Sequence, residues 1–248
     1  PVGAQCVSQA FEKGQLSSSD ASRMLVICNN CGPAFLFGMT AAIFDAWYVP
    51  WILWVIQIAS SFAAARLMQG QPMPVRQVSN NGLTLIQSLN RAIKVMASVC
   101  GWVVLFRIVL AFFEGWFLWL LPLEIQVAIS GLLELSNGCF ELIRLDKAGL
   151  RFILCAGMLN FGGICVTLQT FSVTSPIIDR SHYFSGKAFQ CCFAMILAWC
   201  AQMRLFPAEQ RWSPPAPIGI LVLVIAVLLG IILRKSKNKS SIPQVLGV

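Results

Sequence analysis

Charged residues are scarce in this chain of 248 residues. Asp, Glu, Lys and Arg together make up 11% of it, whereas 57% of its residues are hydrophobic. A soluble domain usually carries about twice that share of charge. The composition therefore argues against a soluble protein and favours a single all-α bundle in lipid, where apolar surface need not be hidden.

Several signatures of catalysis are absent as well. With a single histidine, His182, which we expect in a surface loop, no Ser-His-Asp arrangement is convincing. The chain has no P-loop and no GxGxxG motif, so ATP-driven pumping would need a partner. Cys28 and Cys31 form a C-x-x-C without a second pair or a nearby histidine. We therefore expect no enzyme, no cofactor and no metal site.

Positive charge is spread between the apolar segments. The net charge of +8 comes from Lys and Arg residues that flank hydrophobic runs, where they interact with anionic lipid headgroups. A nucleic-acid surface would instead need a basic face on a folded domain. The lipid bilayer is thus an expected partner, and nucleic acid is not.

Long apolar runs predict the membrane-spanning helices, because a span needs about 20 mostly apolar residues. The predicted spans are residues 24–44, 46–65, 95–113, 152–178, 188–203 and 213–233, and a further apolar run, 115–133, contains Pro122. The second span begins with Trp47, Tyr48, Trp51 and Trp54, which are typical of a membrane interface. A polytopic helical membrane protein is therefore the expected fold class.

Two of these runs contain residues that break helices. The interruptions comprise Asn29, Asn30, Gly32 and Pro33 in the first run, and Asn160, Gly162 and Gly163 in the run 152–178. Each follows a turn of small residues, since Gly3 lies 26 residues before Asn29 and Asn137 lies 23 residues before Asn160. The likeness predicts an internal repeat, with one re-entrant hairpin and one broken transmembrane helix in each half.

The distribution of basic residues predicts how the two halves are oriented. If residues 115–146 form a hairpin that enters and leaves on one face, twelve of the eighteen basic residues share the other face with the C-terminus. That set includes Lys187, placed in the loop before the span 188–203. The positive-inside rule then puts the C-terminus in the cytoplasm. The hairpins enter from opposite faces, so the repeat is inverted.

The expected organisation has four parts, and it leaves room for a homo-oligomer. They are a first repeat (1–66), a cytoplasmic loop (67–90), a second, inverted repeat (91–206), and a final transmembrane helix with a basic cytoplasmic tail (207–248). Unwound backbone in lipid survives only where it is buried or lines a cavity. Paired breaks in an inverted repeat are typical of secondary transporters. The alternative is a pair of ordinary kinks, because Gly and Pro are frequent in membrane helices.

Several motifs resemble those of one family. The first half contains Pro1-Val-Gly-Ala-Gln, Phe11-Glu-Lys-Gly-Gln-Leu-Ser and Cys28-Asn-Asn-Cys-Gly-Pro-Ala-Phe-Leu-Phe-Gly38, and the second contains Leu133-Glu-Leu-Ser-Asn-Gly138 and Phe161-Gly-Gly-Ile-Cys-Val-Thr-Leu-Gln169. Together they resemble the sporulation integral membrane protein YlbJ family. Ser-Gly usually precedes the opening motif there, so we expect that an N-terminal region is missing.

The resemblance implies an architecture and a function. The family belongs to the nucleoside-recognition gate group, which looks like the transport domain of concentrative nucleoside transporters, with two opposed hairpins and two broken helices around a site. It implies a secondary transporter or permease for a small anionic metabolite, such as dipicolinate, in the membrane that surrounds the forespore of a bacterium during endospore formation. The alternatives are a nucleoside or ion-coupled transporter, and a non-transporting scaffold for spore maturation whose polar breaks satisfy one another.

Carried onto this chain, the resemblance also implies site residues. The candidates for substrate binding are Gly3, Asn29, Asn30, Gly32, Pro33, Asn137, Asn160, Gly162, Gly163 and Gln169. Their amides would orient a substrate or a coupling ion, and their glycines would let the backbone approach closely. Glu134 is the candidate for ion or proton coupling, since a carboxylate inside lipid is costly. Its alternative is a helix cap or a group near the interface.

Overall fold

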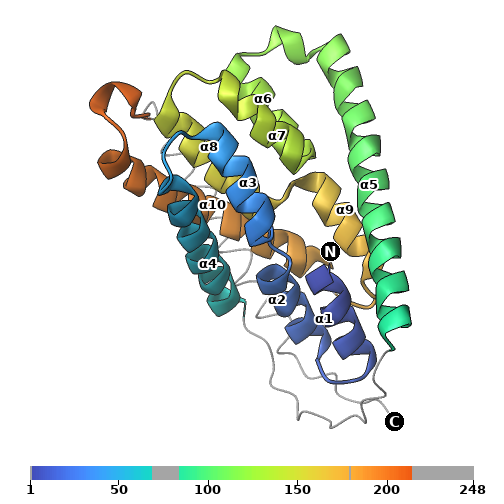
Figure 1. Cartoon of the computed structure of the whole chain (residues 1–248). Helices are drawn as coiled ribbons and strands as arrows, with labels where there is room; N and C mark the ends of the chain where they lie inside the picture. Colours follow the sequence, from blue (N-terminus) through green and yellow to red (C-terminus); the bar gives the residue numbers. More distant parts are fainter. Residues whose placement is uncertain (1, 69–83, 179, 214–248) are drawn as a thin grey trace, which may run out of the picture.

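The computed structural model describes residues 2–68, 84–178 and 180–213, and within them it contains helices and no strands (Figure 1). The helices are α1 (Val2–Glu12), α2 (Ser18–Cys28), α3 (Pro33–Ile43), α4 (Val49–Leu67), α5 (Leu85–Trp116), α6 (Leu123–Leu133), α7 (Leu135–Glu141), α8 (Ala148–Phe161), α9 (Gly163–Val173) and α10 (Arg180–Leu205). The short 3-10 helices are η1 (Leu118–Leu120), η2 (Leu142–Arg144) and η3 (Ala208–Gln210). The predicted final span and the basic tail lie, apart from Ser213, outside these residues.

Five segments of the described chain are long and apolar enough to cross a membrane. They are Ser18–Ile43, Val49–Leu67, Leu85–Trp116, Ala148–Val173 and His182–Leu205. The first combines α2 with α3 and the fourth combines α8 with α9, so both spans are broken where the sequence predicts it. The fold class of an all-helical membrane protein with two broken spans is confirmed to this extent.

The apolar run 115–133 does not form one continuous helix. α5 ends at Trp116, and the next regular α-helix, α6, has only 11 residues. That length is well short of the roughly 20 residues that cross a bilayer. Pro122 explains the interruption, because proline lacks an N–H and disfavours helical backbone in the residue before it. The helix can restart only after it, and Pro122 is the N-cap of α6.

Two helices begin earlier than predicted. α5 starts at Leu85, inside the predicted loop 67–90, where Thr84 and Gln87 form a capping box. α10 starts at Arg180, so His182 and Lys187 lie in a helix and not in a loop. The loop placement of His182 and Lys187 was wrong because the polar residues in the first turns of α10 hide its apolar periodicity.

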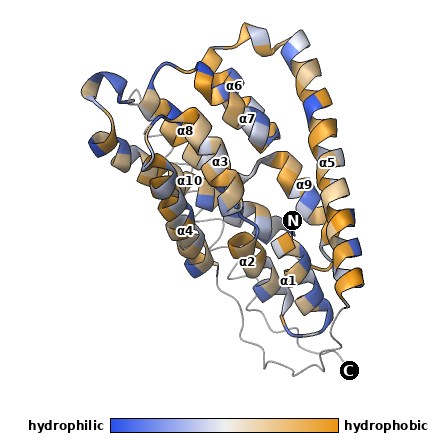
Figure 2. Cartoon of the chain, in the orientation of Figure 1, coloured by the Kyte–Doolittle hydropathy of each residue, from blue (hydrophilic) through white to orange (hydrophobic). Residues whose placement is uncertain are grey.

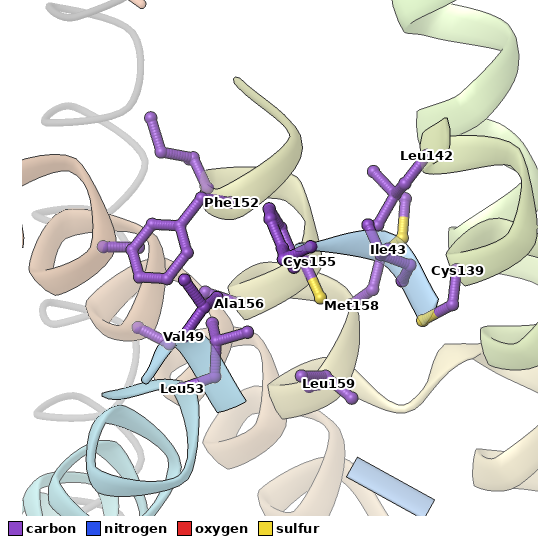
Figure 3. Close-up of a cluster of buried hydrophobic side chains, with 14 of the residues drawn as sticks. Ile43, Val49, Leu53, Cys139, Leu142, Phe152, Cys155, Ala156, Met158 and Leu159 are labelled. Atoms are coloured by element: carbon purple, nitrogen blue, oxygen red, sulfur yellow. The ribbon is translucent and has the colours of Figure 1, made fainter. Parts of the chain in front are cut away.

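The centre of the bundle is α8, which packs mainly against α10 and α4. Nearly every residue of α8 is buried. The main apolar core joins this helix to side chains of α4 and α7, with Phe152, Cys155, Ala156 and Leu159 facing Val49, Leu53 and Cys139 (Figure 3). A second cluster, which includes Leu25, Val26 and Tyr183, joins α1 and α2 to α10. The two broken spans therefore both pack against α4 and α10.

The outer surface is apolar, as expected of a protein in lipid. Large exposed side chains follow α4 and α5, among them Trp51, Phe62, Met96, Ile108 and Phe112. Figure 2 shows hydrophobic residues along the whole length of α5. In water these apolar side chains would have to be covered by other groups, whereas in a bilayer the lipid tails solvate them. This surface supports an integral membrane protein.

Two pairs of short helices lie at opposite ends of the bundle. α1 and α2 pack together at one end, and α6 and α7 pack together at the other (Figure 1). α6 and α7 approach closely, since a Cβ on Gly138 would collide with the backbone of Gly131. The prediction that these pairs are re-entrant hairpins of an inverted repeat remains a prediction.

Candidate functional site

The first break separates α2 from α3. α2 ends at Cys28, and Asn29 caps it with backbone angles of φ −99° and ψ 62°, outside the helical region. Gly32 then adopts an extended conformation and Pro33 opens α3. Proline suits this position because the first helical N–H has no intrahelical partner. The break is therefore encoded locally by Asn29, Gly32 and Pro33.

Side chains hold the first break in place. The amide of Asn29 is buried and donates to the hydroxyl oxygens of Thr170 on α9, at 2.6 Å, and Tyr183 on α10, at 2.8 Å. Gln57 of α4 closes a second link, because its Nε2 donates to the Cys31 carbonyl at 3.0 Å and its Oε1 accepts from the Cys31 thiol at 2.8 Å. Three helices thus fix the unwound segment.

The second break has a different construction. α8 ends at Gly162, whose φ of 84° is left-handed, and Gly163 follows with φ 80°. Residues with a Cβ rarely adopt such angles. A Cβ on Gly163 would also lie 3.2 Å from the carbonyl oxygen of Gly131 and 3.3 Å from that of Leu133. The break therefore packs its bare backbone against the junction of α6 and α7.

Asn160 reaches from the last turn of α8 toward the first break. Its Oδ1 accepts from Ser60 Oγ at 2.6 Å and from Gln190 Nε2 at 3.0 Å, and its own Nδ2 donates to the Ala156 carbonyl at 2.8 Å. Asn30, in the first break, also accepts a hydrogen bond from Gln190. Its Oδ1 accepts from the same Gln190 Nε2 at 2.8 Å. One glutamine of α10 therefore bridges the two broken spans.

Lys187 is the other bridge between the breaks. Its side chain is 1% exposed, and its Nζ donates to Asn30 Oδ1 at 2.7 Å, to the Asn160 carbonyl at 3.3 Å and to Gln190 Oε1 at 3.1 Å. Within the described residues, no carboxylate oxygen lies within 4.0 Å of this nitrogen. The ammonium is thus surrounded by neutral acceptors.

These residues form one cluster, which we call the polar centre. Its members are Asn30 from the first break, Ser60 and Ser61 of α4, Asn160 at the end of α8, and Lys187 and Gln190 of α10. Ser61 Oγ accepts from both the Asn30 and Gln190 amides at 2.9 Å. Three helices and the first break therefore contribute to a cationic, hydrogen-bonded site between the two breaks.

Of the predicted residues, Asn30 and Asn160 lie in the polar centre and Asn29 lies beside Asn30. Gly3 packs against the Cys28 carbonyl where α1 meets α2. Gln169 is buried on α9, where its Nε2 donates to Cys165 Sγ at 3.2 Å. Gly3 and Gln169 therefore support the surroundings of the breaks and do not join the cluster.

Glu134 is a buried helix cap. Its carboxylate accepts from the backbone N–H of Ser136 at 3.0 Å and of Asn137 at 2.8 Å, the first turn of α7, and the side chain is 2% exposed. A carboxylate at this end of a helix satisfies N–H groups that have no intrahelical partner. The capping alternative is thus observed, while a role in ion or proton coupling remains a prediction.

The sequence-based reasoning missed Ser60, Ser61, Lys187 and Gln190. The spacing of two of them could have indicated the site, because Lys187 and Gln190 are three residues apart and would share one face of a helix. Two adjacent serines in an otherwise apolar run gave a weaker signal on α4. Groups of three His, Cys, Asp or Glu that could hold a metal ion do not occur among the described residues.

Comparison of the chain with protein-family models, with curated proteins and with solved structures gives no match. The fold and the site define the protein as an all-helical integral membrane protein in which two broken spans meet at a buried cation. The resemblance to the YlbJ family, and everything it implies about sporulation, remains a prediction.

Proposed function

We propose that the protein is a secondary transporter or permease that moves a small anionic metabolite across a membrane, with the polar centre as its binding site. The observation that carries this proposal is Lys187, a buried ammonium whose hydrogen-bond partners among the described residues are all neutral. An isolated charge inside a membrane is costly and usually marks a substrate or ion pathway. An anion would supply the missing negative charge.

The surroundings of Lys187 suit an anion that also needs hydrogen bonds. The side-chain amides of Asn30, Asn160 and Gln190 converge there, together with the hydroxyls of Ser60 and Ser61. Amide and hydroxyl donors bind carboxylate oxygens, and charge-assisted bonds are about twice as strong as neutral ones. A small carboxylic acid, dipicolinate by resemblance, fits this chemistry better than a neutral nucleoside.

The location of the polar centre supports movement as well as binding. It joins the unwound end of α2 to the last turn of α8, and both helices belong to broken spans. Sites between discontinuous helices at the bilayer midplane are the usual arrangement in secondary transporters. A substrate that competes for Lys187 would loosen the bridge between the two breaks. Loosening that bridge is the expected link between binding and conformational change.

A non-transporting membrane scaffold is the second candidate. It is favoured by one observation, that the amides of Asn29, Asn30 and Asn160 all find partners within the protein. A purely structural role requires such saturation. It does not explain a buried ammonium among neutral groups, because an apolar residue of similar volume would stabilise a static bundle at least as well.

The test is uptake of labelled dipicolinate and of a labelled nucleoside into proteoliposomes that contain the full-length protein. Lys187→Gln should lower dipicolinate uptake by about 100-fold or more, because it removes the charge that pairs with the substrate. Lys147→Gln is the matched control, since Lys147 is exposed at the start of α8. Equal uptake by the two variants, or dipicolinate uptake no faster than in protein-free vesicles, would contradict the proposal.

A further inference from the structure

Two charged residues are almost fully buried in the described part of the chain, Glu134 and Lys187. The carboxylate of Glu134 is satisfied by two backbone N–H groups of α7. Lys187 has amide and carbonyl oxygens as partners and no counter-charge among the described residues. When Lys187 is protonated, the interior therefore contains one positive charge that no described protein group neutralises.

Other titratable groups near the polar centre do not change this balance. The thiols of Cys31 and Cys191 face Lys187. Of the packed helices, α4 contributes the hydroxyl groups of Ser60 and Ser61 to the centre. The basic residues of α2 and α8 nearest to it in sequence, Arg23 and Arg151, are only partly buried, and Arg151 lies nine residues from Asn160, about 13 Å along the helix. Lys187 thus sets the local charge.

The geometry around Lys187 Nζ is that of an ammonium. An ammonium has three N–H donors and no acceptor, and Nζ has three oxygen acceptors, on Asn30, Asn160 and Gln190. A neutral amine would leave one of these three oxygens facing a lone pair. The side chain can therefore keep its proton with the protein's own acceptors as well as with a substrate.

From this balance we propose that the polar centre moves one negative charge with each substrate molecule. This inference rests on the proposed function and adds the ionisation state of the substrate. A monocarboxylate crosses as its monoanion, paired with Lys187. A dicarboxylate takes one proton from water, forms the hydrogen-dicarboxylate and crosses with that proton bound, which makes the proton its coupling ion. Lys187 keeps its own proton throughout, so both substrates move the same charge.

The test uses the full-length protein in proteoliposomes with two probes that share a ring, pyridine-2-carboxylate and pyridine-2,6-dicarboxylate. Radiolabelled uptake and the charge moved under an imposed membrane potential are measured together. We expect one negative charge per molecule for both probes. Lowering the pH at constant dianion concentration should raise dicarboxylate uptake by about tenfold per pH unit, because the monoprotonated form follows the proton concentration. Monocarboxylate uptake should change much less.

The outcomes separate this inference from the proposed function. Two charges per dicarboxylate molecule, with uptake independent of pH, would overturn the inference while the transport function stands. Zero net charge for the monocarboxylate would also overturn it, because Lys187 would then gain and lose a proton in each cycle. Uptake that Lys187→Gln leaves equal to that of Lys147→Gln, or no uptake of either probe, would overturn the proposed function itself.

Discussion

The two helix breaks of this protein reach similar positions by different physical means. The first is held by side-chain hydrogen bonds from Asn29 and Asn30, and its glycine, Gly32, has an ordinary backbone conformation with open space around its Cα. The second depends on left-handed backbone at Gly162 and Gly163. Backbone angles fix one break, and polar partners fix the other.

This difference predicts which substitutions each break tolerates. A break fixed by backbone angles tolerates no Cβ, whereas a break fixed by side chains tolerates substitution of its glycine but not of its asparagines. It also suggests which half moves. The first break can rearrange by exchanging hydrogen-bond partners, while the second is wedged against the junction of α6 and α7. Conformational change at the polar centre should therefore begin at the first break.

The largest effect on stability is expected from Gly163→Ala. The alanine would have to adopt a φ near 80°, and its Cβ would lie 3.2 Å from the Gly131 carbonyl oxygen. The variant should therefore lose about 2–4 kcal/mol of unfolding free energy. Gly32→Ala, the control in the other break, should change it by less than about 0.5 kcal/mol. Reversible unfolding in mixed micelles measures both. Equal losses in the two variants would show that the breaks do not differ as described.

A smaller loss is expected from Asn160→Leu. The variant keeps the branched shape of the side chain but removes the acceptor for Ser60 and Gln190, and leaving those donors unpaired should cost about 1–3 kcal/mol. Substrate uptake should be abolished although the protein still inserts into the membrane. Asn137→Leu tests the other asparagine predicted in the second half, and its uptake should persist because Asn137 lies outside the polar centre. Full uptake by Asn160→Leu would remove Asn160 from the site.

The smallest effect tests the link between the first break and α10. Tyr183→Phe removes the hydroxyl that accepts from the Asn29 amide, while the bond from that amide to Thr170 remains, so the loss should be about 1 kcal/mol. The chain has one other tyrosine, Tyr48, which is exposed near the start of α4. Tyr48→Phe should leave the melting temperature unchanged. A larger effect from Tyr48→Phe would contradict the assignment.

The sequence was informative where local chemistry determines the structure. Apolar runs predicted five described spans, and Asn, Gly and Pro predicted both breaks, because left-handed angles and missing N–H groups are properties of single residues. The run 115–133 is interrupted for the same kind of reason, because it contains Pro122, which is the N-cap of α6.

The polar centre itself could not be predicted in full. Asn30 and Asn160 lie at breaks and were found there, but Ser60 and Lys187 come from uninterrupted helices. Whether such a side chain faces lipid or the interior depends on how α4 and α10 pack against α8, which is a tertiary property. Lys187 was predicted to lie in a loop because a charged residue usually marks the end of a membrane span.

The most direct test of the central claim is whether Lys187 contacts the two breaks in a lipid bilayer. Solid-state NMR on protein labelled with 15N-lysine and 13C-asparagine detects a lysine Nζ within a few ångströms of asparagine carbonyl carbons. The account predicts a through-space signal from Nζ to an Asn side-chain carbonyl and to an Asn backbone carbonyl, at an ammonium chemical shift, lost in Lys187→Gln and kept in Lys147→Gln. A spectrum without these signals, or signals that survive Lys187→Gln, would contradict it.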